Sequence, residues 1–469
     1  MDKRITFLGA ARNVTGSRFF LQLGKIRLLV DCGLHQEREH QDRDFKPFPV
    51  PPERIQAVLI THAHLDHCGY LPKLVREGFR GTVYCTPATA EVVRILLLDS
   101  AYLQEEDAKF KRKRHGRQHK EAKYGYEPLY TIKDAEACAP YFKKVKLLEP
   151  VNLGRGVSAI FHESGHILGS SSIRVDLDDG SERCSVLFSG DLGRYDKPIL
   201  NDPSPFDHAD FAVVESTYGD SDHSEERDIP AELAEVVNDT VARGGNLLIP
   251  AFAVERAHEV LYHLSNLIRD KRIPPLLTFL DSPMALDVTE VFERHTELFD
   301  EDMRDLVAAG NSPFEFPQLV RCRTAQQSQA INTIKGTVII LAGSGMCVGG
   351  RIKHHLAQHI FKPESTVLFV GYQADGTLGR QILDGKPKVR ILGSEYDVRA
   401  KIVRIHGFSA HADRGGIVDW LKVLRRTPRK IFITHGEQAA AEALRDYMRE
   451  REGWQAVVPA YREEHLLQD

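Results

Sequence analysis

The sequence predicts an α/β protein of more than one domain, and three observations support this class. Short apolar runs that are typical of buried strands alternate along the chain with stretches that look helical. Several of these runs end in a polar residue followed by glycine, which lets the backbone turn tightly and a ligand approach. The chain has 469 residues, enough for two to three domains with sizeable cores.

The first part of the chain alternates between predicted strands and helices. We expect two strands joined by a loop within residues 4–30, and a strand at Phe211–Val214 that enters a second domain. The elements predicted between them are strands at 55–61 and 81–86 and helices at 69–78 and 88–112.

The second part alternates in the same way until the chain returns to the first domain near residue 402. Such alternation favours a parallel sheet with helices on its faces. The predicted strands are 246–250, 276–280, 337–342 and 365–370, and the predicted helices are 228–243, 253–270 and 283–296.

The most informative segment, residues 61–67, reads Thr-His-Ala-His-Leu-Asp-His and follows the apolar run 57–60. That run predicts a buried strand, so the cluster stands where a strand passes into a loop. Four ligand-type residues in six positions suit two adjacent divalent metals, and zinc is the default for imidazole-rich hydrolytic sites. A polar surface loop is the alternative, but it would need these four residue types by accident.

Two metals need more ligands than this segment supplies, and other strand-like runs end in suitable residues. Each of these residues has a glycine beside it or two positions away. They are Asp31, His166, Asp191 and His435.

This ordered set resembles the signature of the metallo-β-lactamase superfamily, His-x-His-x-Asp-His followed by a distant His, Asp and His. The resemblance covers nearly the whole chain and implies an αββα sandwich that binds two Zn²⁺ ions. It assigns His62, His64 and His166 to one metal, Asp66, His67 and His435 to the other, Asp191 as the bridge, and Asp31 as the carboxylate that orients a ligand histidine.

The segment between Asp191 and His435 is long enough for a complete extra domain. Residues 213–219 and 406–413 resemble the acidic motif A and the histidine motif B of the β-CASP nucleases, and His435 resembles motif C. A histidine at motif C resembles the RNA-acting members, among them the compact prokaryotic ribonucleases and the pre-mRNA 3′-end processing endonuclease. The implied division is a core at 1–205, a β-CASP cap at 206–401 with a parallel sheet flanked by helices, and the closing part of the core at 402–469.

The resemblance implies a zinc-dependent ribonuclease of RNA processing or decay. A hydroxide that bridges the metals is expected to attack phosphorus in line and to give a 5′-phosphate and a 3′-hydroxyl. His411 is expected to protonate the leaving oxygen and Glu215 to hold its ring, with Asp66 and Asp31 completing the catalytic set. Endonuclease action is favoured, and 5′-exonuclease action is left open.

Contacts to RNA are predicted from weaker signals. The loop with Ser344 and Gly345 has anion-binding geometry, Arg380 would neutralise backbone charge, and Tyr218 could stack on a base. Each has an ordinary alternative: a structural turn, a surface ion pair and a half-buried tyrosine. The basic segment Lys109–Lys123 is predicted either to contact phosphates or to be a solvated helix extension.

Composition narrows the class of protein. Hydrophobic content of 42%, charged content of 27% and a net charge of −4 are ordinary for a globular protein, so RNA must bind to local basic patches.

We expect neither a signal peptide nor a membrane span, and hence a cytoplasmic protein. The seven cysteines form no Cys-x-x-Cys pair and are expected to be buried free thiols. Single-stranded RNA is the expected partner, no membrane is expected, and a homodimer is left open.

Other functions were weighed against this one. A small-ester or thioester hydrolase of the same core would need no large cap and no role for Glu215 and His411. A DNA-acting β-CASP nuclease would tend to carry valine at motif C. A flavodiiron-type enzyme would place a carboxylate where His64 stands, and a scaffold without metals would not need the complete ligand set.

Overall fold

The computed structural model describes residues 3–115, 127–178, 180, 183–223 and 228–468. The chain forms two compact units. Unit 1 consists of Met1–Asp196, Asp202–Asp222 and Ala410–Asp469, and unit 2 consists of Lys197–Asn201 and His223–Ser409.

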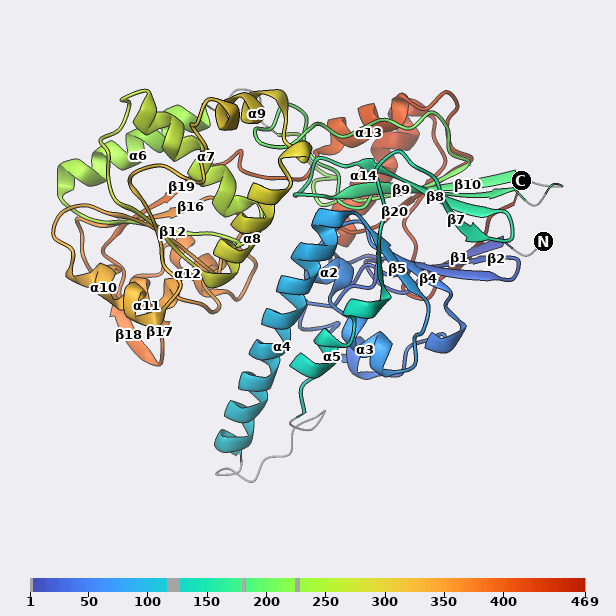
Figure 1. Ribbon diagram of the computed structural model, residues 1–469, viewed down its shortest axis with the longest axis horizontal. Helices are drawn as coiled ribbons and strands as arrows, with labels where there is room; N and C mark the ends of the chain where they lie inside the picture. The colour runs from blue at the N-terminus through green and yellow to red at the C-terminus, as the bar shows by residue number, and fades with distance from the viewer. Residues whose placement is uncertain (1–2, 116–126, 179, 181–182, 224–227, 469) are drawn as a thin grey trace. The chain divides into compact units, whose positions relative to one another are not determined.

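The described residues of unit 1 form two seven-stranded sheets (Figure 1). In each sheet one half is antiparallel and the other half is parallel. The first sheet runs β22 (Glu464–Leu466), β1 (Lys3–Phe7), β2 (Phe19–Leu23), β3 (Ile26–Val30), β4 (Ala57–Leu59), β5 (Thr82–Cys85) and β6 (Phe142–Lys144). The second runs β21 (Ala456–Val457), β20 (Lys430–Ile433), β11 (Phe211–Val214), β10 (Arg183–Phe188), β9 (Ser171–Asp178), β8 (Val157–Glu163) and β7 (Val151–Gly154).

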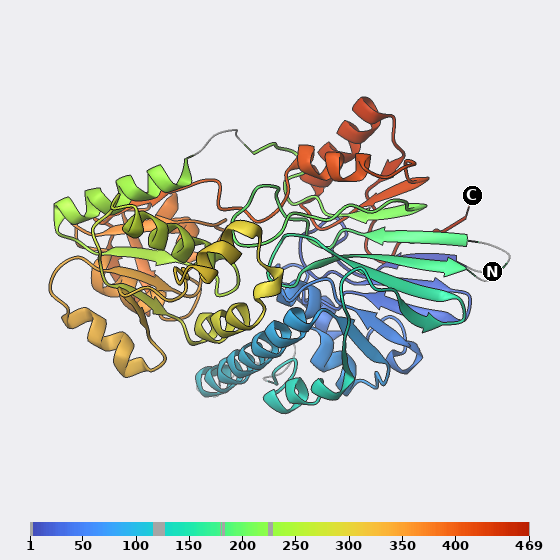
Figure 2. The same cartoon turned by 45° about the horizontal axis from the view of Figure 1, so that its top comes forward.

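The two sheets of unit 1 share one hydrophobic core. Buried side chains of both sheets belong to the same cluster, and the rings of Phe7 and Phe432 lie 5.1 Å apart across it. Burial alternates along β8, with its inward side chains in this core, as expected for a strand covered on one face. Helices cover the outer faces (Figure 2). They are α1 (Asp42–Phe45), α2 (Leu65–Cys68), α3 (Leu71–Arg76), α4 (Pro87–His115), α5 (Ile132–Glu136), α13 (Arg414–Lys422) and α14 (Gln438–Glu452). This is the predicted αββα sandwich.

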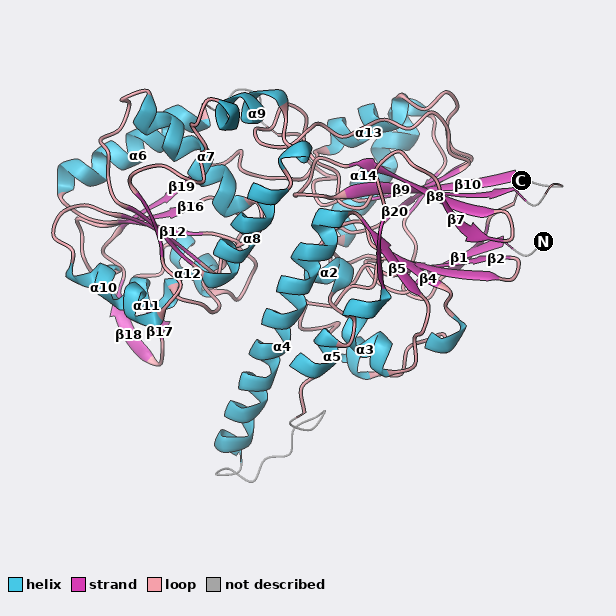
Figure 3. Ribbon diagram, in the orientation of Figure 1, coloured by secondary structure: helices cyan, strands magenta, loops and turns pink. Residues whose placement is uncertain are grey.

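Unit 2 contains a parallel sheet between two layers of helices (Figure 3). Its central strands are buried on both faces, which is why they appear in the sequence as unbroken apolar runs. The order is β14 (Leu319–Arg321), β13 (Thr278–Asp281), β15 (Ile339–Ala342), β12 (Leu247–Pro250), β16 (Thr366–Phe369) and β19 (Lys401–Arg404), with a separate hairpin of β17 (Lys388–Ile391) and β18 (Ser394–Asp397). The helices are α6 (Ile229–Arg243), α7 (Arg256–Arg269), α8 (Pro283–Arg294), α9 (Glu301–Ala308), α10 (Ala325–Ala330), α11 (Ile352–His359) and α12 (Leu378–Leu383).

Two details of the predicted elements differ in the structure. Residues 4–30 hold three strands instead of two, because the turn at Gly24 and Lys25 joins β2 to a further strand, β3. The strand Phe211–Val214 lies in unit 1, between β10 and β20. The main part of unit 2 therefore begins after Asp222, at His223.

The cysteine prediction is confirmed: all seven lie in the described part of the chain, where each is buried and free. Among the described residues, no helix has the length and apolar character needed to cross a membrane.

His258, in α7, predicts a pH dependence of stability that is independent of the candidate site. Its Nε2 lies 3.0 Å from the hydroxyl of Thr289, which itself donates to the carbonyl of Ala285, so Nε2–H is the donor. Burial lowers the pKa of His258 to about 3. The unfolded chain takes up a proton below about pH 6.5 and the folded chain does not, so stability falls as pH drops through that range, by about 2 kcal/mol at pH 5.

We expect a His258→Gln variant to lack this contribution. Between pH 7.5 and pH 5, its free energy of unfolding in urea should fall by about 2 kcal/mol less than that of the parent. An identical fall in both proteins would show that the pKa of His258 is the same in the folded and the unfolded chain.

Candidate active site

The candidate site lies in unit 1, where several strands of both sheets end. His62 and His64 follow β4, and Asp66 and His67 lie in the short helix α2 directly after them. Asp31, His166, Asp191, Glu215 and His435 follow β3, β8, β10, β11 and β20. Because the carboxyl ends of parallel strands meet at one edge of a sheet, residues from across the sequence converge here.

The first group of donors is His62, His64, His166 and Asp191. His62 Nε2 lies 3.0 Å from His64 Nδ1, and His166 Nε2 lies 3.3 Å from the same atom. The Oδ2 atom of Asp191 lies 3.3 Å from His62 Nε2 and 3.4 Å from His166 Nε2.

The second group is Asp66, His67 and His435, and it faces the other oxygen of Asp191. Asp191 Oδ1 lies 3.2 Å from His67 Nε2 and 3.5 Å from His435 Nε2, and Asp66 Oδ2 lies 3.3 Å from His435 Nε2. Oδ1 is buried and accepts no hydrogen bond from the residues that the structure describes. One carboxylate thus presents one oxygen to each group.

The spacing of these donors fits metal ions. Two ligand atoms of a tetrahedral zinc site, with bonds of about 2.0–2.1 Å, lie about 3.3–3.4 Å apart, and most separations here are close to that. In the first group, burial lowers the pKa of His62 to about 3 and that of His64 to about 4, so both imidazoles are neutral. A neutral imidazole can offer a lone pair to a cation.

Four of the ligand histidines are held at Nδ1, which leaves Nε2 for a metal. The acceptors are Asp31 Oδ2 for His67 at 2.8 Å, Thr61 Oγ1 for His62 at 3.0 Å, Thr217 Oγ1 for His435 at 3.2 Å and the Ala410 carbonyl for His166 at 3.4 Å. The Thr61 hydroxyl donates to Asp31, so one carboxylate orients two ligands.

Backbone geometry completes the site. Asp31 and His435 adopt φ of 58° and 49°, in the left-handed region that residues other than glycine rarely occupy and that recurs at functional sites. At Gly33 a side chain is excluded, because a Cβ atom there would lie 1.6 Å from the carbonyl oxygen of Asp66. This glycine lets the segment that carries Asp66 and His67 approach the end of β3.

His411 and Glu215 lie directly beside the donors. Both oxygens of Glu215 contact His411 Nδ1, at 3.1 and 3.0 Å, and Glu215 Oε1 also accepts a hydrogen bond from the backbone N–H of Leu192 at 2.6 Å. The His411 ring lies 4.5 Å from that of His166. Glu215 is buried, so His411 is held by a fixed carboxylate.

Comparisons with known proteins agree with this geometry. A model of the metallo-β-lactamase superfamily matches residues 14–234, a model of the Beta-Casp domain matches 257–382, and one described as a Zn-dependent metallo-hydrolase RNA specificity domain matches 395–459. A ribonuclease of Thermus thermophilus is 38% identical over 94% of this chain and 95% of its own. The chain belongs to the β-CASP ribonuclease family.

Other relatives place this β-CASP protein in a wider group. The transcription termination factor FttA of Methanosarcina mazei is 32% identical over 94% of this chain and 68% of its own, and that of Methanocaldococcus jannaschii is 31% identical over 97% and 70%. A protein of unknown function from Enterococcus faecalis has a solved structure with a TM-score of 0.55 at 12% identity, covering 99% of this chain and all of its own, which shows the shared fold. As a family member, the chain is a metal-dependent hydrolase that acts as a nuclease.

In the site of this β-CASP ribonuclease, the pKa values of the histidines are shifted in different directions. Burial lowers the pKa of His166 well below its ordinary value. Burial also acts to lower the pKa of His411, but the carboxylate of Glu215 outweighs it and raises that pKa to about 9. The carboxylates of Asp191 and Asp31 likewise raise the pKa of His67 against the effect of burial.

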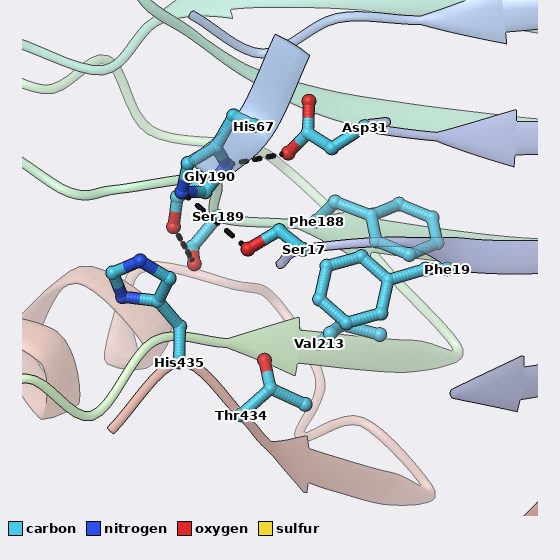
Figure 4. A pocket seen from close by; sticks show the side chains of 10 residues that line it. All are labelled: Ser17, Phe19, Asp31, His67, Phe188, Ser189, Gly190, Val213, Thr434 and His435. Atoms are coloured by element: carbon cyan, nitrogen blue, oxygen red, sulfur yellow. Dashed lines mark hydrogen bonds and ion pairs between the residues drawn. The ribbon is translucent and has the colours of Figure 1, made fainter. Parts of the chain in front are cut away.

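A small cavity of about 10 Å³, enough for one water molecule, lies behind His67 and His435 (Figure 4). Its apolar wall includes Phe19 and Phe188, and its polar wall includes Ser17, whose Oγ lies 3.4 Å from His67 Nε2. Sequence reasoning missed Ser17, as it missed Thr61 and Thr217, because a lone hydroxyl residue carries no ligand signal.

The residues predicted to contact RNA belong to different units. Tyr218 is in unit 1, with its ring 6.4 Å from that of His411. Ser344, Gly345 and Arg380 are in unit 2. The hydroxyl of Ser344 accepts from the N–H of Gly349 within its own loop. Arg380 forms ion pairs with Asp375 and Asp384, the ordinary alternative for this residue.

The basic segment Lys109–Lys123 is described only in its first part, since residues 116–123 lie outside the described residues. In that part Lys109 pairs with Glu106, Lys111 with Asp107 and Arg112 with Glu127. These carboxylates offset much of the local positive charge, so the contribution of the segment to RNA binding stays a prediction.

Thr217 provides a test of how the histidines are held. A Thr217→Val variant keeps the shape of the side chain but removes the acceptor for His435 Nδ1. We expect its affinity for one zinc ion to fall about 10- to 100-fold, the usual effect of removing such a partner. Competition with a zinc-binding dye measures this. Unchanged affinity for both ions would contradict the assigned orientation of His435.

Proposed function

We propose that the chain is a zinc ribonuclease that binds two zinc ions per chain and cuts single-stranded RNA. The observation that carries this proposal is Asp191, whose two oxygens face two groups of histidines at the spacing of metal ligands. His62, His64 and His166 would hold one ion, Asp66, His67 and His435 the other, and Asp191 both. When bound, the ions would lower the pKa of water and offset negative charge on the scissile phosphate.

The other residues of the site orient the metal ligands and supply a proton to the leaving group. Asp31 fixes His67 directly and His62 through Thr61, so the ligand set keeps its geometry as substrate enters. Glu215 holds His411 by Nδ1, so Nε2 is the nitrogen that would give a proton to the leaving 3′-oxygen. The products would be a 5′-phosphate and a 3′-hydroxyl.

RNA as the substrate is supported by the family. The matched RNA specificity domain and the names of the relatives, a ribonuclease and a transcription termination factor, agree with the histidine at position 435. The Glu215–His411 pair favours the nuclease over a small-ester or thioester hydrolase of the same core, which would need the metals but has no assigned role for this pair.

We favour internal cutting over 5′-exonuclease action, and a circular RNA tests both. With zinc present, the wild-type chain should open a circular single strand and then shorten the linear product. A DNA circle of the same sequence serves as the control for sugar specificity. Cutting of linear RNA alone would show that a free end is required, as it is for a 5′-exonuclease, and cutting of neither RNA would overturn the proposed function.

A further inference from the structure

The parallel sheet of unit 2 has a topological switch point at its centre. Strands β12 and β15 are neighbours, but the chain leaves β12 towards β13 on one side and leaves β15 towards β16 on the other. Right-handed crossovers therefore place the following helices on opposite faces, and Figure 3 shows α7 and α11 on opposite sides of the sheet. In open α/β sheets, ligands bind just outside the carboxyl ends of the strands at such a point.

The loops at this point carry exposed aromatic rings. Phe252 follows β12 and is 39% exposed, and Tyr372 follows β16, the other neighbour of β12, and is 55% exposed. The ring of Phe252 lies on the backbone of the loop after β15, because a Cβ atom on Gly345 would be 2.7 Å from its Cδ2. Any side chain at position 345 would displace this ring.

A buried amide holds these loops together. Gln373 is 2% exposed, and its Nε2 donates to the carbonyls of Gly345 at 2.9 Å, Tyr372 at 3.0 Å and Gly371 at 3.3 Å. The loop after β15 and the loop after β16 are thus fixed by one side chain. A surface that is ordered in advance loses little conformational entropy when a ligand binds.

The charge at this edge favours an uncharged, flat group over a phosphate. Arg380, in α12 shortly after Tyr372, is paired with Asp375 and Asp384. The loops also offer the exposed surface of two rings. A nucleobase suits such a surface, because every base has a π-face that stacks on an aromatic ring whatever the sequence.

We propose that Phe252 and Tyr372 form a stacking platform for bases of single-stranded RNA. The inference rests on the proposed function and adds to it a base-binding site in unit 2. It separates two roles: Phe252 and Tyr372 bind bases of the strand, and the donors of unit 1 bind the phosphate that is cut.

An abasic scan combined with a Phe252→Ala variant tests the platform. Phosphorothioate-linked single strands, each lacking one base, are titrated onto the zinc-loaded chain, and binding is followed by fluorescence anisotropy. In the parent, loss of one or two particular bases should weaken binding about 5- to 150-fold each. In Phe252→Ala, loss of at least one of those bases should have no further effect, because its stacking partner is already gone.

Two further variants test whether the effect depends on an aromatic ring at position 252. Phe252→Trp keeps an aromatic surface and should restore the effect of the missing base. Phe361→Ala removes a ring of similar exposure, 42%, that lies before β16 at the amino edge of the sheet, and its scan should match that of the parent.

Additive effects of Phe252→Ala and of every missing base would overturn the platform and leave these rings as a surface for another kind of partner. A parent chain that neither binds nor cuts any RNA strand would instead overturn the proposed function.

Discussion

Replacing Asp191 with alanine is expected to abolish RNA hydrolysis and to remove at least one metal ion. Its two oxygens lie 3.2–3.5 Å from four histidine nitrogens, two in each donor group, so the variant loses a ligand from both groups. Loss of metal catalysis removes several kcal/mol of transition-state stabilisation, and kcat/KM should fall at least about 10³-fold. Elemental analysis and RNA cleavage measure the two effects.

With zinc present, the variant should also unfold more easily than a matched control. An ion that no longer binds to the folded chain no longer stabilises it against unfolding. Asp419→Ala is the control, because this aspartate of α13 has a side chain that is 75% exposed. A full complement of two zinc ions in Asp191→Ala would contradict the bridging assignment.

The ligand residues could be predicted from the sequence because each follows a strand-like run within a short motif. His62, Asp66 and His67 stand within six positions of the sequence, and their spacing alone indicates a metal. The orientation of the rings could not be predicted. His64 turns Nδ1 towards the other donors whereas His62 turns Nε2, and this choice depends on partners such as Thr61 that are set by tertiary packing.

The contacts predicted for RNA depended more on tertiary structure. Arg380 is a free cation in the sequence, but in the structure Asp375 and Asp384 hold it, one of them a turn further along α12. Phe252 lies between a predicted strand, 246–250, and a predicted helix, 253–270, where the sequence does not show its surroundings. Only the pairing of β12 with β15 and β16 shows that this ring stands beyond the edge of the sheet.

Replacing His411 with alanine should separate the chemistry from metal binding. The ring of His411 is in neither group that is assigned to an ion. It belongs to a third cluster with Asp191 and Glu215, in which its Nδ1 is held by Glu215, so the variant should keep both zinc ions. The cleavage rate on RNA should fall about 10²- to 10⁴-fold, the usual contribution of a general acid. His208→Ala is the control, since that side chain is 54% exposed and its loss should leave the rate unchanged.

The leaving group shows whether His411 donates a proton or only binds substrate. A 3′-alkoxide needs a proton as it departs, whereas a nitrophenolate is stable without one, so His411→Ala should lose far less on a nitrophenyl phosphodiester than on RNA. Glu215→Gln should show the same difference in a weaker form, because the amide can still hold the ring but no longer stabilises its charged form. Equal losses on both substrates would mean that His411 positions the phosphate. The proton would then have to reach the 3′-oxygen from another group or from solvent.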